Sequence, residues 1–216
     1  MLRNICVFVA IWLMFFGNII FAESNKGIVE MPEGFEGVHL GMLMEKFLKI
    51  RPNANVYPIE MDSLDQKVDL TKPDQSLSEF IEGNPIFFLG MYDFKNGKLK
   101  NILLIGSWDI EHIKKYRQSF ISSCIKRWDS NFQKKIFKLE PKTKREHLAP
   151  LLVWEKKTAV IAAVCTPEYE DKTLKEGGFL ICIFPKNDLE TLADFSGEKV
   201  EEQTCKKLFK SIGIKY

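Results

Sequence analysis

The chain has 216 residues, of which 45% are hydrophobic and 28% are charged, and its formal net charge is +2 at pH 7. These are ordinary values for a globular protein, so they exclude a chain that is disordered throughout. A charge so close to neutral also gives the whole molecule no general attraction to nucleic acid or to a membrane surface.

The first 22 residues predict where the protein is located. Arg3 is followed by twelve consecutive apolar residues, from Ile5 to Phe16, and the segment closes on Ala22. One positive charge, a short apolar run and a small closing residue are typical of a secretory signal peptide, and the run is too short for a comfortable membrane span. We therefore expect cleavage after Ala22 and a periplasmic or secreted mature chain from Glu23 onwards, with no transmembrane segment. An uncleaved N-terminal anchor and a buried core helix are the alternatives.

Residues 23–36 are polar and predict an irregular lead-in to a globular region that spans 37–216. Within 38–50, apolar residues recur at helical spacing from Leu43 to Ile50, which predicts a short amphipathic helix.

The next segment predicts little regular structure. Residues 53–75 carry many charges and several prolines and asparagines, as an irregular excursion does. Ser76 and Glu79 then have the spacing of a capping box, so we expect a short helical turn over 76–82.

The clearest hairpin follows. Two apolar runs, 86–94 and 99–105, flank Asn96-Gly97, and both of these turn residues tolerate positive φ. A second helix is expected directly afterwards, because Asp109 is a good N-cap and apolar residues mark one helical face as far as Trp128.

The rest of the chain predicts another hairpin, a strand and a helix. In chain order these are a basic connector at 126–145, strands at 151–154 and 158–165, a polar loop at 166–177, a strand at 179–184 and a C-terminal helix that opens near Ser196. A helix followed by antiparallel strands thus occurs twice. We expect an α+β fold class with helices packed on antiparallel sheet, either as one region or as two tandem helix–hairpin units at 37–107 and 108–216.

Two motifs resemble those of a known group of exported domains. Residues 35–47, Phe-Glu-Gly-Val-His-Leu-Gly-Met-Leu-Met-Glu-Lys-Phe, resemble the helix start of SmpA/BamE-like outer-membrane assembly lipoproteins and beta-lactamase inhibitor proteins. Residues 92–99, Tyr-Asp-Phe-Lys-Asn-Gly-Lys-Leu, are similar to the strand that often follows there. The resemblance implies a helical layer on an antiparallel sheet, sometimes in tandem, and a binding module with no catalytic residue to transfer. Leu43 stands where those domains have Ser or Thr, and Glu23 stands where a lipoprotein has its lipidated cysteine, which argues against a lipoprotein role.

The sequence offers no assembled catalytic or metal-binding set. Its three histidines, His39, His112 and His147, lie in different expected elements and lack partners at metal-ligand spacing. The acidic cluster at 168–171 lacks the alternation and the glycine of a calcium loop, which favours a solvated loop. We therefore expect no catalytic residue, no bound metal and no cofactor.

Four cysteines follow the expected cleavage site: Cys124, Cys165, Cys182 and Cys205. An even number in an exported chain permits disulfides. If a bridge forms, we expect Cys124–Cys205, because both lie on apolar helix stripes. Cys165 and Cys182 flank a loop and would lie about four positions out of register, beyond the reach of a bridge. The alternative is that each cysteine is a small buried hydrophobe.

The strongest charge feature is the segment 126–145, in which eight Lys or Arg residues face two acidic ones and aromatic residues interleave. Such a patch suits anionic headgroups or an acidic protein. The alternative is a solvated helix end and loop whose aromatics pack on the sheet. The candidate binding residues are Trp128, Lys134, Lys135, Lys138, Lys142, Lys144 and Arg145.

Two functions remain open from the sequence. The first is an exported, non-enzymatic binding or scaffold protein of the cell envelope, whose partner is an envelope protein or an anionic surface and not nucleic acid. The second is a periplasmic or secreted hydrolase-like enzyme, in which a carboxylate or His112 becomes the acid/base only in three dimensions.

Overall fold

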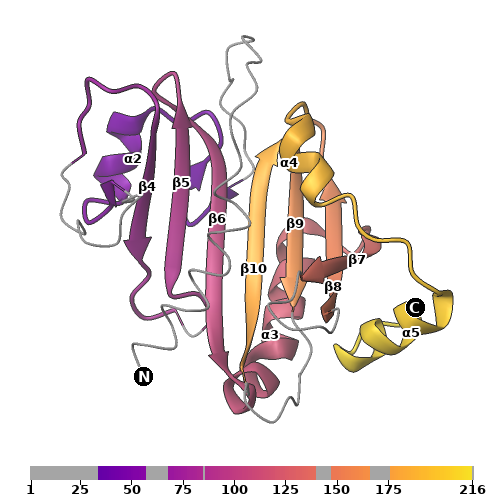
Figure 1. Cartoon of the computed structure of the whole chain (residues 1–216). Helices are drawn as coiled ribbons and strands as arrows, with labels where there is room; N and C mark the ends of the chain where they lie inside the picture. Colours follow the sequence, from indigo (N-terminus) through magenta and orange to yellow (C-terminus); the bar gives the residue numbers. More distant parts are fainter. Residues whose placement is uncertain (1–33, 57–67, 85, 140–146, 166–175, 216) are drawn as a thin grey trace.

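The structure, a computed structural model, describes residues 34–56, 68–84, 86–139, 147–165 and 176–215. The expected signal peptide and most of the expected lead-in lie outside these ranges. Eight strands form one antiparallel sheet: β3 (Asn55–Val56), β4 (Gln75–Phe80), β5 (Leu89–Lys95), β6 (Lys98–Asp109), β7 (Gln133–Leu139), β8 (His147–Glu155), β9 (Ala159–Cys165) and β10 (Glu176–Pro185). Their spatial order is β3-β4-β5-β6-β10-β9-β8-β7 (Figure 1).

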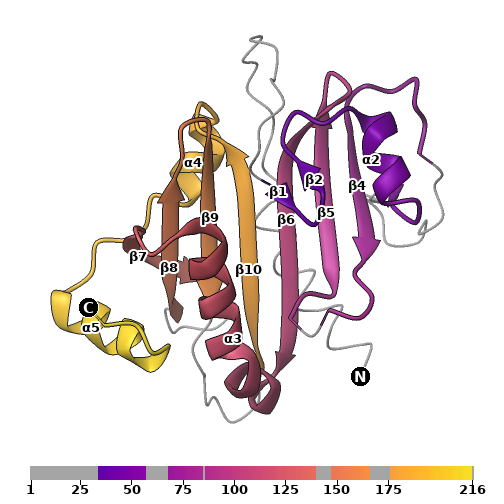
Figure 2. The ribbon, with the colours of Figure 1, turned by 180° about the vertical axis from the view of Figure 1, so that it is seen from behind.

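The described helices are short, and they flank this sheet. They are α2 (Met44–Ile50), α3 (Ile110–Trp128), α4 (Leu189–Asp194) and α5 (Glu202–Ser211). A separate two-stranded sheet pairs β1 (Gly34–Phe35) with β2 (Val38–His39). Side chains of α2, α3 and α5 join the apolar cluster on what we call the first face of the large sheet, which Figure 2 shows from the front, whereas α4 joins the cluster on the second face. No described helix is long and apolar enough to cross a membrane.

The predicted fold class is wrong, because the described chain is mostly β. We expected an α+β fold with helices packed on antiparallel sheets, or two tandem helix–hairpin units. Instead, one continuous eight-stranded sheet runs across both halves of the chain. Three segments that we had assigned to loop or helix are strands, namely β3, β4 and β7, and they extend the sheet on both sides. The division at residue 107 falls within β6, and two architectural units at 37–107 and 108–216 remain a prediction.

The predicted helical turn over 76–82 is strand β4. Its capping-box residues bond across the strand pair: Ser76 Oγ donates to Asp93 Oδ1 at 2.6 Å, and Glu79 Oε1 accepts from the Tyr92 hydroxyl at 2.7 Å. Leu77 between them is fully buried on the first face. Side chains that can cap a helix can equally well bond to a neighbouring strand, and here the strand partner decides.

The predicted basic connector contains the edge strand β7. Ile136 is buried in the first-face cluster, and its neighbour Phe137 packs on the second face, as strand alternation requires. Lysines on an edge strand discourage pairing with other chains, so a lysine-rich strand at this position is physically reasonable. The high charge obscured the alternating pattern in the sequence.

Other expected elements are confirmed. The first hairpin is β5–β6, with φ of 52° at Asn96 and 69° at Gly97. The second hairpin is β8–β9, the strand at 179–184 lies within β10, and the helix after Asp109 is α3.

Three boundaries differ from those expected. The helix expected in 38–50 is confined to α2, because Val38 and His39 form β2, and Gly34–Phe35 of the expected lead-in forms β1. The C-terminal helix begins at Glu202 instead of near Ser196. Helix α4, capped by Asp188, was not predicted.

The end of α3 is fixed to the β8–β9 turn. Lys156 Nζ donates to the carbonyl oxygen of Trp128 at 2.6 Å and lies 2.7 Å from Asp129 Oδ2. Trp154 Nε1 donates to the carbonyl oxygen of Asp129 at 2.9 Å. The last carbonyls of a helix lack intrahelical partners, and a cation there also offsets the helix dipole. These bonds therefore set where α3 leaves the sheet.

We predict that Lys156→Met lowers the free energy of unfolding by about 1–2 kcal/mol, because the Trp128 carbonyl loses a charged donor at a helix end. The matched control is Lys157→Met, an exposed neighbour that should change stability by less than about 0.5 kcal/mol. Urea denaturation followed by tryptophan fluorescence measures both variants. Equal stabilities of the two variants would show that this bond does not hold α3 in place.

Candidate functional site

Two of the predicted basic residues, Lys134 and Lys135, lie on opposite faces of the sheet. Lys134 and Lys135 are consecutive residues of β7, so their side chains leave opposite faces of the sheet. Lys134 Nζ donates to the carbonyl oxygen of Lys215 at 2.5 Å, on the first-face side. Lys135 packs against Gly197, where an added Cβ would lie 2.8 Å from Lys135 Cβ. Lys138 belongs to β7, and Lys142, Lys144 and Arg145 lie outside the described residues.

Trp128 is a core residue. Only 7% of it is exposed, and its ring centroid lies 5.5 Å from that of Trp154. A ring packed in this way contributes to the first-face cluster and presents little surface to a ligand.

The histidines remain on separate elements: His39 is half-buried in β2, His112 belongs to α3 and His147 begins β8. Within the described ranges, no three His, Cys, Asp or Glu side chains are grouped as a metal site would need.

The four cysteines are free thiols in the structure. Cys124 is buried in the first-face cluster and Cys205 packs against it, so the expected bridge stays a prediction. Cys165 pairs with Phe179 and Cys182 with Ala162, which sets Cys165 and Cys182 three positions apart and on opposite faces, out of reach of each other. Burial raises the pKa of Cys124, and burial raises the pKa of Cys165 to about 12 although Arg117 opposes the shift, so neither thiol is poised as a nucleophile.

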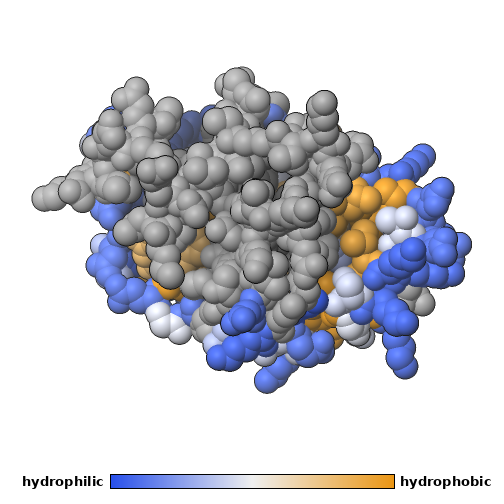
Figure 3. Space-filling view, turned by 60° about the horizontal axis from the view of Figure 1, so that its bottom comes forward, coloured by the Kyte–Doolittle hydropathy of each residue, from blue (hydrophilic) through white to orange (hydrophobic). Residues whose placement is uncertain are grey.

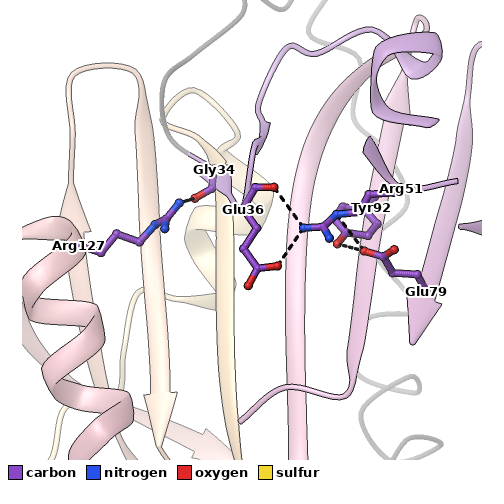
Figure 4. Close-up of polar contacts among 6 residues, drawn as sticks. All are labelled: Gly34, Glu36, Arg51, Glu79, Tyr92 and Arg127. Atoms are coloured by element: carbon purple, nitrogen blue, oxygen red, sulfur yellow. Dashed lines mark hydrogen bonds and ion pairs between the residues drawn. The ribbon is translucent and has the colours of Figure 1, made fainter. Parts of the chain in front are cut away.

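A chain of polar groups runs from the surface into the first-face core (Figure 4). Arg51 Nη2 lies 3.2 Å from Glu36 Oε2, and Arg51 Nε lies 3.2 Å from Glu79 Oε1, at ion-pair distance but without hydrogen-bond alignment. Glu79 accepts from the hydroxyl of Tyr92, which is fully buried. Burial first, and then the bond to Glu79, raise the pKa of Tyr92, so the phenol keeps its proton and acts as a donor.

Two arginines from different halves of the chain hold the β1–β2 hairpin. Arg51 Nη2 lies 3.4 Å from the carbonyl oxygen of Glu36, and Arg127 in the last turn of α3 donates to the carbonyl oxygen of Gly34 at 2.6 Å (Figure 4). The turn has φ of 46° at Glu36 and 83° at Gly37. A residue other than glycine costs about 1 kcal/mol or more in this region, and the contacts with Arg51 help to offset that cost.

The second face carries a polar row across three strands. The register pairs Ser76 with Asp93, and Asp93 with Asn101. Asp93 accepts hydrogen bonds from both of these side chains. Burial nevertheless raises the pKa of Asp93, with the carboxylate of Asp188 adding to the shift and the ammonium of Lys100 opposing it.

This polar row is connected to α4. Lys100 Nζ lies 2.8 Å from Asp188 Oδ2, and Asp188 caps α4 by accepting from the backbone N–H and the hydroxyl of Thr191. Asp188 and Thr191 are both buried or nearly so. The result is a carboxyl group of raised pKa beside a serine hydroxyl and a lysine ammonium, a combination able to hold or move a proton.

Next to the polar row lie two apolar rows, which we call the apolar rows of the second face. The strands β5, β6, β10, β9 and β8 are neighbours in this order, so each row crosses five strands. One row is Leu89, Ile105, Leu180, Val164 and Leu151; the other is Met91, Leu103, Cys182, Ala162 and Val153. Among the described helices, α4 alone packs on this face, with Phe195 at its end stacked between Phe137 and Phe184.

The sequence did carry a signal for this second apolar face. Every residue of β9 is buried. Ala-Val-Ile-Ala-Ala-Val-Cys is a continuous apolar run, and a strand that is covered on both faces reads as such a run instead of alternating. We expected helices to cover one face of the sheet and therefore missed the apolar rows. Figure 3 shows the molecule with its lower end forward; to the sides of the part drawn in grey, apolar residues lie at the surface beside strongly hydrophilic ones.

The two motifs that carry the family resemblance lie side by side. The backbone N–H of Gly41 donates to the carbonyl oxygen of Leu99 at 2.7 Å, and the backbone N–H of Leu99 donates to the carbonyl oxygen of Met42 at 2.8 Å. Comparison of the chain with models of protein families, with curated proteins and with solved structures found no match. The resemblance therefore stays an expectation from the two motifs.

We predict that Gly90→Ala lowers the free energy of unfolding by about 1–3 kcal/mol, because overpacking forces its neighbours to move. An added Cβ would lie 2.6 Å from the Tyr92 hydroxyl oxygen, which would have to leave Glu79. The same substitution made in a Tyr92→Phe background should cost less, because that oxygen is gone. Urea denaturation of the four proteins gives the coupling. Equal costs in both backgrounds would contradict the proposed clash.

We also predict that Asp93→Asn becomes more stabilising, relative to the wild type, as the pH rises. The pKa of Asp93 is raised in the fold. The stability it contributes is therefore fully present below its unfolded pKa, which is near 3.9, and is lost as the pH rises through the folded pKa. Asparagine stays neutral and can still accept from Ser76. Urea denaturation between about pH 4 and pH 8 measures the difference, and a difference that does not change with pH would refute the shift.

Proposed function

We propose that the chain is an exported, non-enzymatic binding or scaffold protein of the cell envelope, and that a partner protein covers the apolar rows of the second face. The observation that carries this proposal is the mismatch between the face and its cover. The two rows cross five strands, and most of their side chains are buried in the structure. Among the described helices, however, only α4 packs on that face, at one end of it. A contiguous apolar face of this size marks an interaction site when it is exposed.

The composition of the remaining chain supports a partner. The segments 57–67, 140–146 and 166–175 are rich in charged residues. The only long apolar run outside the described residues is Ile5 to Phe16. If the chain is cleaved after Ala22, the mature protein lacks this run, and a partner can cover the rows.

The polar row borders the apolar rows of the second face, and its polar side chains can favour one partner over another. Ser76, Asp93 and Asn101 border the apolar rows on the β4–β6 side, and Phe80, at the end of β4, is 72% exposed. An apolar centre with a polar rim is the usual composition of a protein interface. The resemblance of residues 35–47 and 92–99 to exported binding modules agrees with this interpretation.

One observation favours the enzyme as the second candidate. Asp93 has a raised pKa, and its Oδ1 lies 2.6 Å from Ser76 Oγ. Perturbed carboxyl groups are enriched in active sites, although structural networks produce them as well. If Asp93 is an acid/base, Asp93→Asn abolishes a hydrolytic activity of the exported protein; if it only borders an interface, the same variant keeps partner binding.

We predict that the chain from Glu23 to Tyr216 binds 1-anilinonaphthalene-8-sulfonate, a dye that fluoresces on open apolar surface, and that the full chain binds it less. Leu103→Glu, in an apolar row, should lower the dye signal of the shorter chain several-fold. Leu43→Glu is the matched control, because Leu43 is 49% exposed and lies away from the second face. No dye binding by the shorter chain would contradict an open second face.

The partner itself is sought with a photo-crosslinking residue at Met91 or Leu103 in the exported protein. We expect the same partner at both positions, none at Leu43, and loss of the product from position 91 when Leu103→Glu is added. Products that are equally abundant at Leu43 would reject the second face as the contact surface.

A further inference from the structure

Helix α5 lies at the outer edge of the molecule, beyond β8 and β7 (Figures 1 and 2). Its apolar side is used for folding. Phe209, Ile212 and Ile214 are buried in the first-face cluster, and Cys205 and Leu208 pack against that cluster. The opposite side of the helix is therefore the side that solvent or a partner meets.

That outward side carries lysines, and the exposed acidic residues Glu201 and Glu202 lie at the N-terminal end of the helix. Lys206, Lys207 and Lys210 on α5, and Lys215 four residues beyond its end, are all exposed, and we call them the α5 lysine surface. Of the four, only Lys206 forms an ion pair within the described chain, with Glu202 at 2.5 Å.

The α5 lysine surface is held in place from behind. Arg117 Nη1 donates to the carbonyl oxygen of Ser211 at 2.9 Å, and Lys134 Nζ donates to that of Lys215 at 2.5 Å. Gly213, with φ of 79°, makes the turn between these two points. The backbone that carries these basic groups is already fixed, so binding does not have to pay the entropy cost of ordering it.

We propose that the α5 lysine surface is a docking site for a membrane that contains anionic phospholipid. Lysines on the outward side of an amphipathic helix are attracted to such a membrane, each by about fivefold in binding constant. A protein partner would need an anchor such as a buried aromatic side chain or a pocket, and the outward residues of α5 are charged or polar. Because the apolar side of α5 is packed in the core, the protein adsorbs through charge and does not insert the helix into the bilayer.

The test is co-sedimentation of the protein, as isolated from the exporting cell, with vesicles. Vesicles of equimolar phosphatidylglycerol and phosphatidylcholine should bind the protein, and vesicles of phosphatidylcholine alone should not. The variant Lys207→Ala/Lys210→Ala/Lys215→Ala should bind about 100-fold more weakly. The matched control, Lys49→Ala/Lys126→Ala/Lys157→Ala, removes three exposed lysines elsewhere and should bind as the wild type does.

Three results would overturn the proposal: unchanged binding by the α5 variant, an equal loss in the control, or binding that survives salt well above about 0.1 M, where exposed charges are screened within roughly 10 Å. The proposal is independent of the partner on the second face, so Leu103→Glu should leave vesicle binding unchanged. Loss of vesicle binding in Leu103→Glu would assign the membrane contact to the second face and reject α5. Circular dichroism of each variant verifies that the fold is intact.

Discussion

The antiparallel pairing of β6 with β10 is the contact on which the rest of the fold depends. Its register runs from Asp109 opposite Glu176 to Ile102 opposite Ile183. Each of these strands is the last of four in its half of the chain, so the pairing joins β3–β6 to β7–β10 in mirrored order. Separately, each half would leave a long strand edge unpaired. Joined, they give one sheet with two continuous faces, and both the first-face core and the apolar rows extend across the junction.

Several basic side chains are engaged with the backbone of the protein itself. They supply donors to carbonyls that the secondary structure leaves without partners, often at or near helix ends. The pairs are Arg127 with Gly34, Lys156 with Trp128, Arg117 with Ser211 and Lys134 with Lys215. Within the segment 126–145, Lys134 is engaged in this way, and binding through the other candidate residues of that segment stays a prediction.

The sequence correctly predicted the elements that depend on neighbouring residues along the chain. Asn96-Gly97 located the first hairpin because few other residue pairs accept two positive φ angles, and the apolar stripe ending at Trp128 located α3. Prediction from the sequence failed where pairing with another strand determines the structure. Ser76 and Glu79 have helix-cap spacing, yet their partners are Asp93 and Tyr92 across the sheet. The same holds for the candidate site, because the polar row exists only in the register of β4, β5 and β6, which no spacing along the chain encodes.

We expect the sheet to remain folded without residues 1–22 and to keep an apolar second face that a partner can bind. Hydrogen exchange of the chain from Glu23 to Tyr216 tests this most directly. We predict that the amides of the β6–β10 pairing, from Ile102 to Gly106 and from Phe179 to Ile183, exchange as slowly as they do in the full chain, because strands at the centre of a sheet open only on global unfolding. Fast exchange there in the shorter chain would contradict this expectation, and would make the N-terminal apolar run part of the folded core.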